Sequence, residues 1–150
     1  MTTTMTRTQR EEFLADTRIA VLSVASDDHR PPLTVPVFYG YQPGGEITFF
    51  TGTEGRRARK TRLIERAKVL SICVQREEPP FQYVTVEGTL AGIERPPSAE
   101  QLRNVIRRYV PEDVARQWVE EEIGNPAGTL VLFRVRPDRW LSMDAGEDMK

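Results

Sequence analysis

The stretch ITFFTGTEGRRARKTRLI, residues 47–64, begins as an apolar, β-branched and aromatic run and ends in a helical pattern. A turn rich in threonine and glycine joins the two parts, and four cations follow it within five residues: Arg56, Arg57, Arg59 and Lys60. We therefore expect a strand, a short turn and a helix that begins with a cluster of positive charge. The whole chain carries a formal net charge of −1, so this cluster is a local feature.

Helical spacing places several of these cations on the same side of the helix as its apolar residues. Leu63, Ile64 and Ala67 form a stripe that we expect to face a sheet. Counting back from Leu63 and Ile64 by three or four residues reaches Arg59 and Lys60, and counting back by seven reaches Arg56 and Arg57. The residues on the opposite face, which we expect to be solvated, are Arg62, Glu65 and Arg66.

Cations at a helix N-terminus oppose the helix dipole, at a cost of roughly a few tenths of a kcal/mol each, unless an anion is bound there. Free backbone N–H groups, the hydroxyls of Thr51 and Thr53 and the fixed cations would together bind a phosphate. Gly52 and Gly55 would allow a close approach of the backbone. Two other interpretations stay open: a solvated cluster paired with carboxylates such as that of Glu54, and a nucleic-acid patch.

Length and composition fit one globular domain over residues 1–150, with 39% hydrophobic and 29% charged residues. No stretch approaches the roughly 18 apolar residues of a membrane helix, so we expect no membrane partner. The segment MTTTMTRTQREEF lacks the apolar core of a signal peptide, and we expect a cytoplasmic protein. A pI of about 5.9 argues against a nucleic-acid partner.

Apolar runs separated by turn residues predict about six strands, mainly antiparallel. The runs on either side of QPGGE look like a hairpin, Pro36 suggests a strand edge or an interrupted ladder, and Gly88 suggests a bulge. The single Cys73 lies in an apolar run, where we expect a buried residue rather than a reactive thiol. The predicted strands are residues 18–26, 33–41, 47–51, 69–75, 81–94 and 129–137, followed by a short separate segment at 139–144.

Capping signals predict further helices outside the sheet. Thr8 with Glu11, and Ser98 with Gln101, read as capping boxes. A helix that starts at Ser98 would carry an apolar stripe ending at Tyr109. Pro111 is expected to start the next helix, and Gly124 followed by Pro126 to end it. Short spacings between strands favour a barrel or Greek key with peripheral helices over a doubly wound sheet.

Four segments, in this order, resemble the flavin-binding split β-barrel superfamily. This is the pyridoxamine-phosphate-oxidase-like group, which includes deazaflavin reductases that use coenzyme F420. The resemblance runs from about Phe13 to Met143, and it implies an FMN-binding split β-barrel, mainly β with peripheral helices (α+β), that forms a homodimer. The segments are RPPLTVPVFYGY, ITFFTGTEGRRARKTRLI, VTVEGTL and FRVRPDRW.

In that family the helix after the hairpin supplies an arginine and a lysine or second arginine to the cofactor phosphate. Two registers are open here. If residues are counted from the end of FFT, the phosphate-binding pair is Arg56 and Arg57. If they are counted back from LI, the pair is Arg59 and Lys60. Thr51 matches a hydroxyl at the phosphate end in the family.

Other residues are implied near the ring of the cofactor. The family's strand equivalent to TVPVF lays its backbone beside the isoalloxazine, which points to Val35, Pro36 and Val37. Tyr83 falls where relatives place a polar side chain, and Trp140 resembles an aromatic close to the cofactor. In the family the segments that correspond to the surroundings of Tyr83 and of Trp140 often come from the second subunit. The alternative is that both valines, Tyr83 and Trp140 belong to the core.

The resemblance implies an oxidoreductase, dependent on F420 or FMN, that transfers hydride to a small unsaturated or carbonyl acceptor. The Arg-rich helix and the VTVEGTL strand favour F420. No Arg-x-His pattern follows Trp140, and the single His29 lies in a turn expected at the surface, so vitamin B6 oxidation is not expected. No metal-ligand or Ser/His/Asp pattern appears, and the catalytic residues stay unknown, because a flavin does its own hydride chemistry. A non-catalytic cofactor carrier is the alternative.

Overall fold

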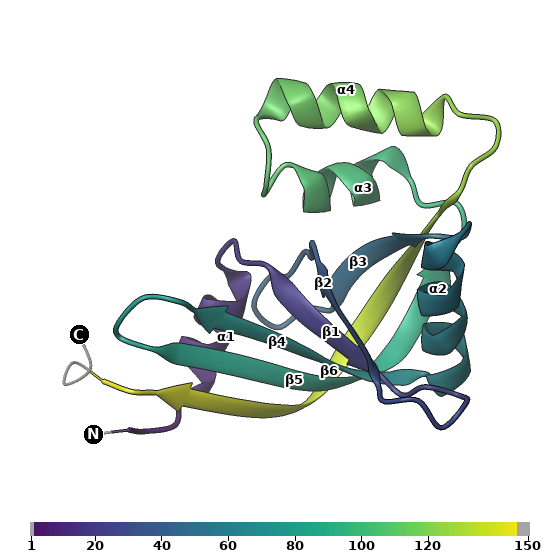
Figure 1. Ribbon diagram of the computed structural model, residues 1–150. Coiled ribbons are helices and arrows are strands. Elements are labelled where there is room, and N and C mark those ends of the chain that lie inside the picture. Colours follow the sequence, from purple (N-terminus) through teal and green to yellow (C-terminus); the bar gives the residue numbers. More distant parts are fainter. Residues whose placement is uncertain (1, 147–150) are drawn as a thin grey trace.

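The computed structural model describes residues 2–146, apart from the side chains of Arg56 and Arg57. Its described strands form one antiparallel sheet in the order β2-β1-β4-β5-β6-β3, which curls into a split barrel with helices around it (Figure 1). The expected fold class, mainly β with peripheral helices, is confirmed. The strands are β1 (Ala20–Val24), β2 (Leu33–Val37), β3 (Ile47–Gly52), β4 (Val69–Arg76), β5 (Gln82–Glu94) and β6 (Leu130–Asp144). The helices are α1 (Arg7–Ala15), α2 (Arg56–Ala67), α3 (Ala99–Ile106) and α4 (Glu112–Ile123).

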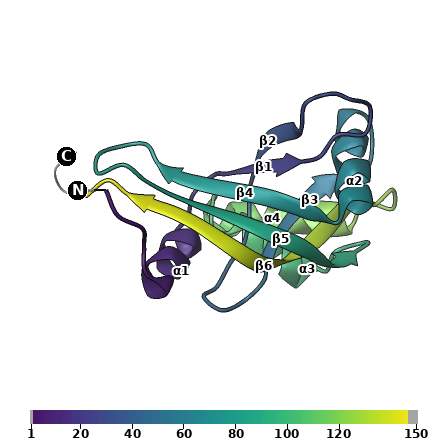
Figure 2. The ribbon, with the colours of Figure 1, turned by 90° about the horizontal axis from the view of Figure 1, so that it is seen from below.

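Alternating burial turns one face of the sheet toward the core. In β1, Ala20, Leu22 and Val24 are buried, whereas the residues between them are not. Helix α2 packs its predicted stripe on this core: Leu63 and Ile64 are fully buried. Burying each of these two side chains contributes roughly 1.5–3 kcal/mol, which fixes α2 and hence the direction of its first turn. Helices α1 and α2 lie at opposite ends of the sheet (Figure 2).

The hairpin expected between residues 33–41 and 47–51 is wrong. Strand β2 pairs with β1, and β3 pairs with β6, so the two strands lie at opposite edges of the sheet. Only an isolated bridge joins Gly40 to Thr48. The cause is the segment after β2, because Tyr39 and Tyr41 turn into the core and carry the chain across the barrel. Pro36 does lie on an edge strand, as its missing N–H requires.

Three further expectations are corrected. Helix α1 starts after Thr6, which forms the capping box with Gln9, so Thr8 is not the cap. Two overlapping boxes exist in TRTQREE, and the earlier one gives the longer hydrogen-bonded helix. Residues 139–144 are not a separate segment, because β6 pairs with β5 as far as Asp144. Cys73 is only partly buried, on the outer side of β4.

The bulge expected at Gly88 is confirmed by a register shift between Glu87 and Gly88 in the β5–β6 ladder. A Cβ at this glycine would lie 2.5 Å from Val135 Cγ1 and 2.9 Å from Arg136 O, so only glycine fits. His29 is exposed, as expected.

Helices α3 and α4 form a hairpin that stands over the β2–β3 end of the barrel (Figure 1). The predicted caps are confirmed: Ser98 forms a capping box with Gln101, Pro111 precedes α4, and Gly124 ends it. Tyr109 lies beyond the end of α3, so it does not extend the helical stripe. A separate apolar cluster holds the hairpin together, and its buried members are Leu102, Ile106, Ala115, Val119 and Leu130.

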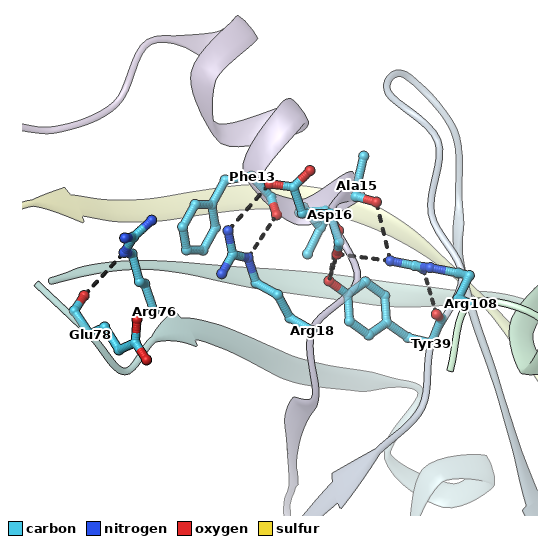
Figure 3. Close-up of polar contacts among 9 residues, drawn as sticks. Phe13, Ala15, Asp16, Arg18, Tyr39, Arg76, Glu78 and Arg108 are labelled. Atoms are coloured by element: carbon cyan, nitrogen blue, oxygen red, sulfur yellow. Dashed lines mark hydrogen bonds and ion pairs between the residues drawn. The ribbon is translucent and has the colours of Figure 1, made fainter. Parts of the chain in front are cut away.

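Arg108 ties this hairpin to the barrel (Figure 3). Its guanidinium donates to Tyr39 O at 2.5 Å, to Ala15 O at 3.2 Å and to Asp16 O at 2.9 Å, and it lies 4.5 Å from the centre of the Tyr39 ring. The Tyr39 hydroxyl in turn donates to Leu14 O at 2.7 Å. One cation thus binds carbonyls at the end of α1 and in the segment after β2.

Candidate functional site

A cleft of about 590 Å³ lies between the sheet, the start of α2 and the inner side of α4. This volume is ordinary for a cofactor or small-molecule site. Its walls are mostly apolar, with one lysine and one glutamate among them. The lining residues are Ile19, Pro36, Val37, Phe38, Phe50, Thr51, Gly52, Lys60, Trp118, Glu122, Thr129 and Leu130.

The end of β3 supplies a hydroxyl that is already engaged. The Thr61 hydroxyl donates to Gly52 O at 2.8 Å, so the buried Thr51 hydroxyl donates to Thr61 Oγ1. Thr53 is held in the same way, with both its N–H and its hydroxyl bonded to Thr129 O. A hydrogen bond donated by either threonine hydroxyl to a phosphate would require one of these bonds to be exchanged, because each hydroxyl has a single proton.

The N-terminus of α2 lacks a side-chain cap beside this strand end, although the Ala58 N–H in its first turn donates to Gly55 O at 3.2 Å. Its cap is Gly55, at φ 61°, with no side-chain hydrogen bond, and the first turn holds no acidic residue. The N–H groups of the first turn therefore lack the usual side-chain cap. Lys60, one turn further on, lines the cleft. The arrangement suits an anion.

The cations of α2 point in different directions. The guanidinium of Arg59 donates to Ser26 Oγ at 2.9 Å and lies 4.0 Å from Asp28, away from the cleft lining. The Ser26 hydroxyl donates to Asp28, and this bond, with Arg30 and Arg59 nearby, lowers the pKa of that carboxyl. The side chains of Arg56 and Arg57 lie outside the described part of the chain.

The opposite face of α2 is solvated, as expected. Arg62 and Arg66 are both more than half exposed and pair with Asp27. Glu65 pairs with Arg95.

The residues expected near the ring separate into two groups. Pro36 and Val37 line the cleft, and Val37 is also a buried member of the core, against which Val35 packs. Tyr83 is exposed on the outer side of β5. Trp140 lies in a second cleft, with its ring 5.0 Å below the guanidinium of Arg10. Within one chain, Tyr83 and Trp140 therefore do not line the cleft that contains Lys60.

The outer face of the sheet is open and partly apolar. A row of paired residues crosses five strands, one from each of β2, β1, β4, β5 and β6. Val21 and Leu141 in this row are 39% and 46% exposed. Ile19, which precedes β1, lines the cleft, so the face is continuous with it. The row is Pro36, Val21, Cys73, Thr85 and Leu141.

The wall that α4 contributes was not expected from the sequence. Trp118 lies 5.8 Å from the Phe50 ring, centre to centre, and Glu122 follows one helical turn later. Phe38 stacks on Tyr109 at 4.2 Å, which joins the cleft to the α3–α4 hairpin. The available signal was the helical spacing of Trp118 and Glu122, which places both on the same side of α4 as its buried residues Ala115 and Val119.

Among the described residues, no cluster of three or more His, Cys, Asp or Glu side chains is arranged to hold a metal ion. None of the helices within residues 2–146 has the length and apolar character needed to span a bilayer.

A curled antiparallel sheet with an anion-suited helix N-terminus beside an apolar cleft defines the class of split-barrel flavin-binding folds. The family model described as pyridoxamine 5'-phosphate oxidase matches residues 6–139, and the chain belongs to this family. No match was found among the curated proteins.

Solved structures share the fold at low sequence identity. An F420 reductase is 19% identical with a TM-score of 0.67, over 87% of this chain and 94% of the other. A conserved hypothetical protein from Mycobacterium tuberculosis is 20% identical with a TM-score of 0.73, over 95% of this chain and 87% of the other. A FAD-binding protein from Mesorhizobium loti is 18% identical with a TM-score of 0.62, over 96% of both chains. The expected superfamily and fold are confirmed.

Proposed function

We propose that the chain binds a phosphorylated flavin-type cofactor, coenzyme F420 or FMN, in the cleft beside α2. The observation that carries this proposal is the N-terminus of α2, which has no side-chain cap, and Lys60 beside a largely apolar cleft. An anionic tail and a flat ring need these two environments side by side. The F420 reductase among the similar structures supports the deazaflavin, at the level of fold.

The phosphate end of the proposed site is formed by α2 and the end of β3. Lys60 and the first-turn N–H groups would hold the anion, and the cations at Arg56, Arg57 and Arg59 stay predictions. Because the hydroxyls of Thr51 and Thr53 are already bonded, we expect them to shape the site more than to bind phosphate.

The ring end of the proposed site is formed by the edge strand β2. The backbone of Val35, Pro36 and Val37 would lie beside the ring, and Phe38 and Phe50 would exclude water from it. When bound, the cofactor supplies the hydride chemistry, so the chain contributes binding, orientation and a dry surface. We infer an oxidoreductase that reduces a small unsaturated or carbonyl acceptor.

A homodimer is part of the proposal. The row from Pro36 to Leu141 is an exposed, partly apolar sheet face continuous with the cleft, as expected of a surface that a second copy covers. Dimerisation through this face would place partner residues at the open side of each cleft. The segments around Tyr83 and Trp140 are the predicted contributors.

The test is oxidation of the reduced, bound cofactor by a panel of quinones, enones and biliverdin-like tetrapyrroles. Faster oxidation than for the free cofactor with any member supports the enzyme. Tight binding without acceleration across the panel would instead indicate a carrier.

A further inference from the structure

Helix α4 presents an aromatic ring and a carboxylate to the cleft, one turn apart. Trp118 and Glu122 are spaced i and i+4, so both lie on one side of the helix. The Trp118 side chain is 42% exposed, although its ring contacts Phe50. A flat surface is therefore available next to an acidic group.

The position of Glu122 is unfavourable in free energy, because the described residues do not fully satisfy its carboxylate. Its Oε1 atom is buried, and no hydrogen-bond partner for it exists among the described residues. A buried polar atom without a partner costs about 1–3 kcal/mol. Glu122 also lies in the last turn of α4, which contains no basic residue, and a negative charge there opposes the helix dipole.

A purely structural role does not explain these features. Glu122 also borders a smaller cleft near Pro97 and Leu102, and its methylene groups could fill space there. A glutamine or methionine would fill the same space without the charge. Unsatisfied polar groups of this kind are typical of sites completed by a ligand.

The lining of the main cleft carries groups of opposite charge. Lys60 and the N-terminus of α2 favour an anion, whereas Glu122 and the C-terminus of α4 favour a donor or a cation. In the proposed function the phosphate binds beside Lys60. The part of the cleft beside Glu122 and Trp118 is then left for the acceptor.

We propose that Glu122 accepts a hydrogen bond from the acceptor substrate, while Trp118 packs against its flat face. The acceptors selected are planar conjugated molecules that carry an N–H or O–H donor and are neutral or cationic, and anionic acceptors are rejected. The inference rests on the proposed function. Hydride comes from the reduced cofactor and the completing proton from solvent, so Glu122 is a positioning and specificity residue.

Three naphthoquinones of similar size test this inference: an aminonaphthoquinone with an N–H donor, methylnaphthoquinone without one, and an anionic naphthoquinone sulfonate. Their dissociation constants are measured by equilibrium dialysis on protein loaded with oxidised cofactor, and KM and kcat are measured with reduced cofactor. For the wild type we expect the aminonaphthoquinone to bind about tenfold more tightly than each of the others, as one hydrogen bond to a charged group predicts.

The variants separate charge from hydrogen bonding. Glu122→Gln keeps the shape and an acceptor oxygen, so it should bind the sulfonate about tenfold more tightly while changing aminonaphthoquinone binding by less than about threefold. Glu122→Ala should lose the preference for the aminonaphthoquinone over the methyl compound. Both effects should appear in KM, with kcat nearly unchanged. Glu121→Gln, at an exposed neighbour, is the matched control and should behave as wild type.

Equal binding of the three compounds by cofactor-loaded wild type would overturn this inference, and so would an unchanged rejection of the sulfonate in Glu122→Gln. In both cases the proposed function would stand, because the cofactor is bound. Failure of the wild type to bind F420 and FMN would overturn both proposals. The wild-type comparison needs no variant, so it decides the question even if a substitution prevents folding.

Discussion

At the scale of single residues, Lys60 and Arg62 lie two positions apart on α2 and therefore point to different sides of the helix. Lys60 lines the cleft, whereas Arg62 reaches Asp27 on the solvated side. We expect Lys60→Ala to weaken binding of F420 or FMN by roughly 1.5–3 kcal/mol, because a charge-assisted bond to phosphate is lost. Isothermal titration measures this loss, with Arg62→Ala as the control. A larger loss in Arg62→Ala than in Lys60→Ala would show that the proposed phase is wrong.

Tyr39 gives a second prediction at this scale, for stability at high pH. Burial raises the pKa of its hydroxyl to about 12, and in the unfolded chain the pKa is near 10. Above pH 10 the unfolded state loses the proton first, so the free energy of unfolding should fall as the pH rises from 10 to 12. The expected fall is about 2–3 kcal/mol. Denaturant unfolding of wild type and Tyr39→Phe at these pH values measures it, and an equal fall in both proteins would contradict the assignment.

At the scale of elements, Arg108 makes polar side-chain contacts between the α3–α4 hairpin and the barrel, beside the contacts of Tyr109 with Phe38 and Arg18. Arg108→Ala removes donors to three backbone carbonyls of the barrel. We expect the free energy of unfolding to fall by about 2–3 kcal/mol. The exposed neighbour Arg107 supplies the control, since Arg107→Ala should stay within about 0.5 kcal/mol of wild type. Similar losses in the two variants would mean that Arg108 does not attach the hairpin.

Local patterns predicted the elements well, and their pairing less well. The stripe of Leu63 and Ile64 predicted the buried side of α2, because helical periodicity is set within a few residues. The pairing of β3 with β6 could not be read locally, because β6 is distant in the sequence and Tyr39 and Tyr41 turn into a core built from distant segments. A QPGGE turn between two strand-like runs predicts a hairpin whether or not the core permits one.

The parts of the candidate site that come from one short segment could be predicted from the sequence, and the parts that come from distant segments could not. The strand end, the helix N-terminus and the cluster at Lys60 lie within one short segment, so the sequence indicated them together. The contribution of α4 was missed, because Trp118 and Glu122 approach β3 only through the packing of α3 and α4. The position of the Val35 backbone beside the ring stays a prediction, and its side chain packs against the core.

At the scale of the whole molecule, the open face of the sheet predicts the assembly. Leu141→Glu places a charge on the proposed dimer surface, where burial without a partner is costly. We expect the wild type to sediment as a dimer and this variant as a monomer at micromolar concentration. Ile93→Glu, at a similarly exposed position outside the row from Pro36 to Leu141, is the control and should remain dimeric. A wild-type monomer with cofactor bound would contradict the proposed assembly.

Cofactor binding tests the central claim most directly. The purified protein is titrated with F420 and, separately, with FMN, and the absorbance and fluorescence of the cofactor are followed. We predict saturable binding of at least one of them at micromolar concentration or tighter, with one cofactor per chain and weaker binding in Lys60→Ala. Binding of neither cofactor at micromolar levels would contradict the claim that this cleft is a flavin-type site.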